Sequence, residues 1–161
     1  MAFELKQDSF AIRRLLISLC WQYILRIRLN TKVNGTTKTV FIAIVDDDEP
    51  LREALGSVMR AAGFSTSTFG SAEEYLDSAG RQRTACLVLD VRLPGMSGIE
   101  LQRRLANDGD ETPIIFVTAH GDASLRDSLM KAGASGFLNK PVRSDALLKE
   151  IRAALAGTIT D

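Results

Sequence analysis

The sequence predicts an α/β protein whose core is a five-stranded parallel sheet covered by helices on both faces. From Val40 onward, strand-like and helical patterns alternate about every 10–15 residues, as they do in βαβ units. Residues 86–89 form a continuous apolar run bounded by turn signals, which is typical of a strand buried on both faces. Such strands belong to parallel sheets enclosed by two layers of helices, so both observations indicate the same fold class.

The expected strands and helices alternate without interruption. Strands are expected at residues 40–45, 64–68, 85–90, 114–118 and 136–139. The first helix starts at Asp48-Glu49-Pro50, because an acid and a proline are start signals in a first turn. Ser71 and Ser97 each begin a capping box and predict the starts of the second and third helices. The fourth and fifth helices are expected at residues 122–131 and 144–157.

Length and charge limit the classes of function. The 161 residues suffice for about one domain with a real core. The net charge is zero, but residues 1–39 hold seven basic and two acidic residues, so they carry +5 and the remaining 122 residues carry −5. A folded part of that sign is a poor candidate for direct binding to nucleic acid.

Cysteine usage points to a reducing compartment. The two cysteines, Cys20 and Cys86, have neither metal-ligand spacing nor the pattern of a disulfide framework. Cys86 falls in an expected strand, where a free cysteine behaves as a small apolar residue. We therefore expect a cytoplasmic protein.

The chain divides into a basic and apolar N-terminal extension (1–39), a folded domain (40–156) and a short tail (157–161). The apolar run at residues 15–25 is too short to span a bilayer. It lacks a small-residue cleavage site and is followed by Arg26 and Arg28, so it does not fit a signal peptide.

Two interpretations of the extension stay open. It is either a helix that binds a membrane surface or a partner protein, or a poorly packed segment without a fixed role. In one version of the second, translation starts at Val33 and residues 1–32 are not native. If the intact mass of the native protein equals that of the full 161-residue chain, a translation start at Val33 is excluded.

Polar side chains lie at the ends of four of the five expected strands. Asp46 and Asp47 follow the first strand, Asp90 and Thr118 end the third and fourth, and Lys140 follows the fifth. In a parallel sheet these carboxyl ends lie along one edge, where ligand-binding and catalytic residues are usually found. Paired carboxylates need a cation and suit Mg²⁺, and a carboxylate can accept a phosphoryl group. Lys140 and Thr118 are then the expected charge and hydroxyl donor.

Five motifs run through the folded domain. They are Val45-Asp-Asp-Asp-Glu-Pro50, Asp90-Val-Arg-Leu-Pro94 with Gly98, Thr118-Ala-His-Gly121, Lys131-Ala-Gly-Ala134 and Phe137-Leu-Asn-Lys-Pro141. In order and spacing they resemble the receiver domain of two-component response regulators, and closely the nitrogen-fixation regulator subfamily. The resemblance covers about three quarters of the chain and implies a doubly wound, flavodoxin-like sheet with strand order 2-1-3-4-5.

The resemblance also implies a role for each matching residue. Asp90 is the expected phosphoacceptor, and it holds Mg²⁺ together with Asp46, Asp47 and the backbone carbonyl of Arg92. Thr118 is the expected switch hydroxyl, and Lys140 pairs with the phosphoryl group. Phe137 occupies the switch aromatic position, where many relatives carry Tyr.

Other positions receive smaller roles. The Lys140-Pro141 peptide is expected to be cis. We expect Asp48 to cap a helix rather than bind the metal. Arg92 and His120 lie at positions that tune the lifetime of the phosphoryl group, and His120 is expected to be an exposed loop residue.

The implied reaction is transfer of a phosphoryl group from a phosphohistidine of a sensor histidine kinase to Asp90, followed by slow self-hydrolysis. We expect no other enzymatic activity. Phosphorylation would draw Thr118 inward, make room for Phe137 and remodel the face of the fourth helix, fifth strand and fifth helix. The expected partners are the kinase and a downstream protein or a second copy of the chain.

Relatives in this subfamily continue into a helix-turn-helix domain, whereas this chain ends at Asp161. We therefore expect no output domain here and no direct contact with nucleic acid. The short apolar run at residues 15–25 also predicts no membrane span. Two alternatives stay open: a truncated remnant of a DNA-binding transcriptional regulator, and a scaffold receiver that is never phosphorylated. An Asp-nucleophile phosphatase is disfavoured because Arg92 stands where it needs a second acid. A Rossmann domain is disfavoured because no Gly-rich turn follows the first strand.

Overall fold

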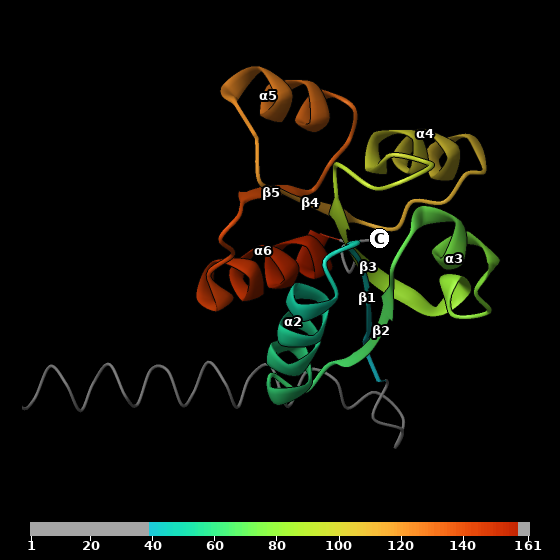
Figure 1. The fold of residues 1–161 in the computed structure, drawn as a ribbon. Helices are drawn as coiled ribbons and strands as arrows, with labels where there is room; N and C mark the ends of the chain where they lie inside the picture. The colour runs from blue at the N-terminus through green and yellow to red at the C-terminus, as the bar shows by residue number, and fades with distance from the viewer. Residues whose placement is uncertain (1–38, 158–161) are drawn as a thin grey trace, which may run out of the picture. The chain divides into compact units, whose positions relative to one another are not determined.

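The computed structural model describes residues 39–157, and the expectations for residues 1–38 and 158–161 lie outside them. Five strands form one parallel sheet in the order β2-β1-β3-β4-β5 (Figure 1), which confirms the expected fold class and strand order. The strands are β1 (Phe41–Val45), β2 (Ser65–Phe69), β3 (Thr84–Asp90), β4 (Ile114–Thr118) and β5 (Gly136–Asn139).

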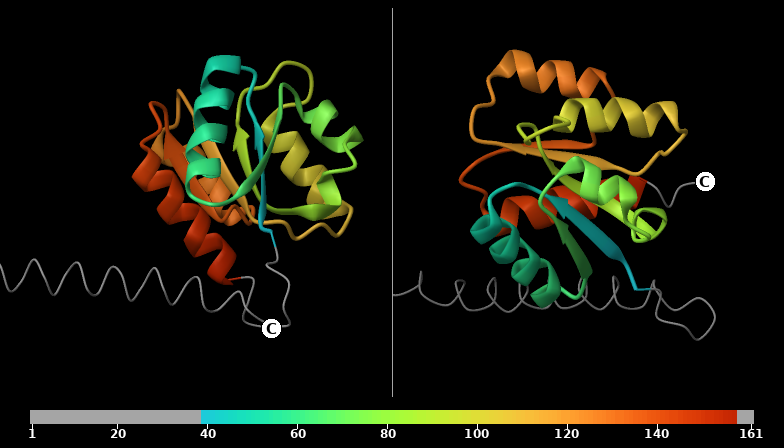
Figure 2. Two further views of the ribbon diagram at one scale, coloured as in Figure 1. Left: turned by 90° about the horizontal axis from the view of Figure 1, so that it is seen from below. Right: turned by 45° about the vertical axis from the view of Figure 1, so that its right-hand side comes forward.

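Helices cover both faces of the sheet, as the two further views show (Figure 2). They are α2 (Glu49–Ala61), α3 (Ala72–Asp77), α4 (Gly98–Asn107), α5 (Ala123–Lys131) and α6 (Ser144–Gly157), with a short 3₁₀ turn, η1 (Arg81–Arg83). α2 and α6 pack on one face, and α3, α4 and α5 pack on the other. Within the described part of the chain, no helix is long and apolar enough to cross a membrane.

The strands alternate their side chains between two cores. In β1, Ala43 and Val45 join the core under α3, α4 and α5, whereas Ile42 and Ile44 join the core under α2 and α6. The central strands are buried on both faces because side chains of successive residues point in opposite directions. Burial on both faces requires the continuous apolar runs from which these strands were predicted.

The helices begin where the sequence predicts. Asp48 caps α2, and its Oδ1 accepts a hydrogen bond from the Leu51 amide at 3.0 Å. Ser97 and Glu100 form a complete capping box at α4. These side chains satisfy amides that have no partner in the first turn of a helix. They therefore set where the chain turns away from the sheet edge.

Some bounds differ from the expected ones. β2 begins at Ser65 and ends at Phe69, one residue later than expected, because it pairs in parallel register with the whole of β1. β1 begins at Phe41 and β3 at Thr84, each one residue from its expected start. The turn η1 was not predicted.

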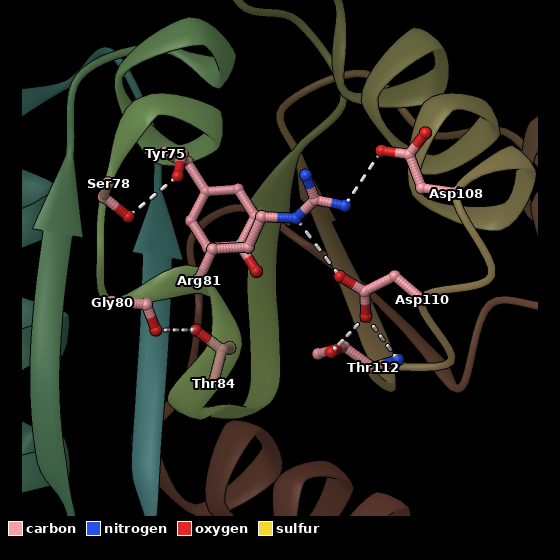
Figure 3. Close-up of polar contacts among 8 residues, drawn as sticks. All are labelled: Tyr75, Ser78, Gly80, Arg81, Thr84, Asp108, Asp110 and Thr112. Carbon is pink, nitrogen blue, oxygen red and sulfur yellow. Dashed lines mark hydrogen bonds and ion pairs between the residues drawn. The ribbon is translucent and has the colours of Figure 1, made fainter.

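A polar cluster holds η1 in place (Figure 3). The Arg81 guanidinium lies 3.0 Å from the Asp108 carboxylate and 3.3 Å from the Asp110 carboxylate, just beyond α4. Asp110 also accepts hydrogen bonds from the amide and hydroxyl of Thr112. The contact joins segments that are 27 and 29 residues apart in the sequence.

Candidate functional site

Two buried carboxylates lie at the carboxyl ends of neighbouring strands. Asp46 follows β1, Asp90 ends β3, and the two strands pair directly. Asp46 is 2% exposed and Asp90 is 5% exposed. The Lys140 ammonium lies 2.8 Å from Asp46 Oδ2 and 2.5 Å from Asp90 Oδ2. One lysine after β5 therefore bridges two acids that are 94 and 50 residues earlier in the chain.

Each carboxylate uses its other oxygen to shape the backbone that follows it. Asp46 Oδ1 accepts a hydrogen bond from the Asp48 amide at 3.0 Å, and Asp90 Oδ1 accepts one from the Arg92 amide at 2.9 Å. Both are turns in which the acid holds the amide two residues ahead. The carboxylates are consequently fixed in orientation by their own loops.

Burial and charge act against each other in this cluster. Burial is the largest influence on the pKa of Asp46 and raises it, although hydrogen bonds from Lys140 and the Asp48 amide oppose the effect. Burial by itself lowers the pKa of Lys140, but its bonds to Asp46 and Asp90 outweigh burial and raise that pKa. The site thus holds its lysine in the charged form and favours positive charge beside the acids.

Thr118 and Lys140 are brought together by strand pairing. Thr118 ends β4, is 1% exposed and pairs with Asn139 of β5. Its carbonyl accepts a hydrogen bond from the Lys140 amide at 2.8 Å, and its hydroxyl accepts one from the His120 amide at 3.4 Å. The Lys140-Pro141 peptide is cis, as expected.

The remaining predicted residues surround these four. Phe137 is half-buried in β5, and its ring packs against Gly121, where an added Cβ would overlap the ring. Arg92 and His120 are exposed. Asp48 uses its carboxylate to cap α2, which agrees with the expected capping role.

Asp46, Asp47 and Asp90 can jointly hold a divalent cation. One oxygen from each lies within 4.8 Å of the others. Opposite oxygens around Mg²⁺ are about 4.2 Å apart, so a small adjustment would bring all three to one ion. The donor set is all oxygen, and the buried Asp46 favours a nearby cation, so these residues fit Mg²⁺.

Two residues beside the site were not predicted. Arg52 of α2 donates a hydrogen bond to the Asp46 carbonyl at 2.7 Å. Glu73 of α3 accepts one from the Met96 amide at 2.8 Å, in the loop that follows Asp90. Each side chain contacts a backbone atom, so a search of the sequence for complementary side chains could not predict either contact.

Comparison with known proteins agrees with this arrangement. Residues 42–152 match the response regulator receiver domain. The chain belongs to the response regulator receiver family. Residues 42–152 are therefore a receiver domain of a two-component response regulator, as the motifs indicated.

Relatives within this receiver family are similar over most of the folded domain. The response regulator protein TodT of Pseudomonas putida is 46% identical over 114 residues, which are 71% of this chain and 50% of TodT. The transcriptional regulatory protein FixJ of Bradyrhizobium diazoefficiens is 39% identical over 114 residues, which are 71% of this chain and 56% of FixJ. The resemblance to nitrogen-fixation regulators is confirmed, although TodT matches at higher identity. The chain spans about half the length of these curated relatives.

Solved receiver structures share the fold. The structure of the response regulator StyR has a TM-score of 0.68 at 46% identity and covers 73% of this chain and 60% of that one. The FixJ-N crystal structure has a TM-score of 0.66 at 38% identity and covers 73% and 94%. Both likenesses concern the receiver fold of this chain.

Proposed function

We propose that this receiver accepts a phosphoryl group on Asp90 from a phosphohistidine of a sensor histidine kinase. The observation that carries the proposal is the bridge from Lys140 to Asp46 and Asp90 at the carboxyl edge of the sheet. It places a fixed positive charge against a carboxylate that has a second acid beside it. This combination suits transfer of an anionic group to a carboxylate nucleophile.

In the proposed reaction, an oxygen of Asp90 forms a bond to phosphorus while the phosphorus–nitrogen bond of the phosphohistidine breaks. The ring, protonated on its other nitrogen, leaves as neutral imidazole and keeps the electron pair of the broken bond, and Asp90 becomes an acyl phosphate. Lys140 offsets charge on the phosphoryl oxygens, and the Thr118 hydroxyl donates a hydrogen bond to one of them. Water later attacks phosphorus, releasing inorganic phosphate and restoring the Asp90 carboxylate.

The proposal includes Mg²⁺ held by Asp46, Asp47, Asp90 and the backbone carbonyl of Arg92. When bound, Mg²⁺ supplies additional neutralisation of phosphoryl charge. The close approach of the three carboxylates supports this part of the proposal. The chain's own residues keep the remaining tasks of orienting and neutralising the group.

The proposed output is a change in the surface formed by α5, β5 and α6, read by a protein partner or a second copy of the chain. A bond between Thr118 and the phosphoryl group would shift the population toward a second arrangement of the loop before α5. Phe137 packs against Gly121 of that loop, and this contact supports the proposal that the ring responds to the change. This chain spans about half the length of its curated relatives, so the output of the whole protein is part of the proposal.

Incubation of the full chain with acetyl phosphate and Mg²⁺, followed by intact mass measurement, tests the phosphoacceptor. We expect a gain of one phosphoryl group that disappears in Asp90→Asn and when a chelator removes the metal. Asp77→Asn, which changes an exposed acid on α3, is the matched control and should label like wild type. Absence of labelling in a folded wild-type chain would favour a scaffold receiver instead.

A further inference from the structure

The loop between β3 and α4, residues 91–97, is fastened at both ends. At its start, the Arg92 amide donates to Asp90 Oδ1 at 2.9 Å. At its end, the Gly98 amide donates to the Val91 carbonyl at 3.1 Å. A Cβ at Gly98 would overlap the Asp90 carbonyl oxygen, so the two ends of the loop lie in direct contact. The loop is therefore closed at its base, and its apex is the part free to tilt.

Glu73 of α3 holds that apex. The Met96 amide donates to Glu73 Oε1 at 2.8 Å across 23 residues of sequence. The same carboxylate lies against Gly95, where an added Cβ would come within 2.7 Å of Glu73 Oε1. Gly95 has φ = +73°, a left-handed conformation that suits glycine. The apex is thus shaped to receive the carboxylate.

The hydrogen bond between the Met96 amide and Glu73 restricts the orientation of the loop backbone. Met96 and the buried Leu93 already pack their side chains on the core under α3, α4 and α5. Apolar packing leaves the peptide planes of a loop free to rotate, whereas a hydrogen bond from a peptide amide to a carboxylate restricts them. That amide bond is the largest influence on the pKa of Glu73 and lowers it, so Glu73 is ionised at neutral pH.

We propose that Glu73 is a positioning residue for the metal ligand at Arg92. The inference rests on the proposed function, because Arg92 matters only if its backbone carbonyl joins Asp46, Asp47 and Asp90 around Mg²⁺. Glu73 fixes the apex four residues beyond Arg92 and so fixes the direction of the peptides between them. Its loss would leave the three carboxylates in place and misplace the carbonyl.

Glu74 offers a matched control in the same turn of α3. Its Oε2 accepts a hydrogen bond from the Gly70 amide at 2.7 Å, four residues away and on the other side of the Ser71 cap. Glu73→Ala and Glu74→Ala therefore remove the same charge from the same helix start. They differ in which loop loses its carboxylate partner. Glu73→Gln keeps an acceptor oxygen without the charge.

The experiment compares these three variants of the full chain with wild type, using Mg²⁺ alone as the probe. Amide chemical shifts during a Mg²⁺ titration give the dissociation constant, and hydrogen exchange reports the Met96 amide. For Glu73→Ala we expect exchange at Met96 to rise about tenfold, the effect of losing one hydrogen bond. We expect the Mg²⁺ dissociation constant to rise about tenfold, the lower end for residues that orient metal ligands.

The controls decide between positioning and mere support. Glu74→Ala should match wild type in both measurements, and Glu73→Gln should recover most of the Mg²⁺ affinity. If Glu73→Ala frees the Met96 amide but binds Mg²⁺ as Glu74→Ala does, the positioning role is wrong. Failure of the proposed function would look different, because the wild-type chain itself would then bind no Mg²⁺.

Discussion

At the scale of single residues, Gly121 leaves room for the Phe137 ring. A Cβ at this position would overlap the ring and lie 2.6 Å from Asn139 Oδ1. We expect Gly121→Ala to lower the free energy of unfolding by about 1–3 kcal/mol, because it overpacks a contact that is already close. Urea unfolding followed by circular dichroism measures this change.

The Phe137 ring accounts for most of that cost, because its Cζ is the atom nearest to the added Cβ. In a Phe137→Ala background, Gly121→Ala should therefore cost much less than in wild type, which is a coupling measurable in a double-mutant cycle. Gly80→Ala is a control, since a Cβ there meets only Ser78 Oγ at 3.7 Å. Equal costs for Gly121→Ala in both backgrounds would contradict the contact.

At the scale of elements, the start of α2 separates capping from metal binding. Asp48 accepts from the Leu51 amide, whereas Asp46 and Asp47 face the cation site. We expect Asp48→Ala to reduce stability by about 1 kcal/mol through loss of the cap, while the Mg²⁺ dissociation constant stays that of wild type. Asp48→Asn should restore stability because asparagine also caps. A loss of Mg²⁺ affinity in Asp48→Asn would make Asp48 a ligand.

The ion pair between η1 and the segment after α4 should be sensitive to acid. Burial raises the pKa of Asp110, but hydrogen bonds from Thr112 and the charge of Arg81 outweigh burial, so the pKa is lowered overall. A lowered folded-state pKa adds stability above the unfolded-state value of about 4, and this stability is lost as pH falls. Asp110→Asn should therefore cost about 1 kcal/mol at pH 7 and less near pH 3.

Urea unfolding at both pH values checks this expectation. The control is Asp145→Asn, which breaks the Arg143 pair, whose side chains are 79% and 70% exposed. A pair so open to solvent should contribute nothing measurable. A pH-independent cost for Asp110→Asn would show that the ion pair is not its cause.

At the scale of the whole molecule, the predictable features are those that depend on neighbours in sequence. β4 and β5 have the predicted bounds because turn residues frame their apolar runs. β2 begins one residue later than the sequence predicts. Its first four residues, Ser65–Thr68, all carry hydroxyl groups at a sheet edge and give little apolar signal. The turn η1 was missed because its stabilising ion pairs come from residues 27 and 29 positions away.

Some residues of the candidate site can likewise be predicted from the sequence, and others cannot. Asp46, Asp90, Thr118 and Lys140 could be placed together because parallel strands bring their carboxyl ends to one edge. Arg52 and Glu73 could not, because each contacts a backbone atom whose position depends on the folded loops.

The strand order β2-β1-β3-β4-β5 also bears on how the protein is made. β1 emerges from the ribosome first, β2 joins one side of it and β3 joins the other. β4 and β5 then extend the β3 side one after the other. Each new strand adds to an edge that already exists, and none has to insert between two paired strands. The strand order therefore allows the sheet to be extended at its edges in the order in which its strands are synthesised.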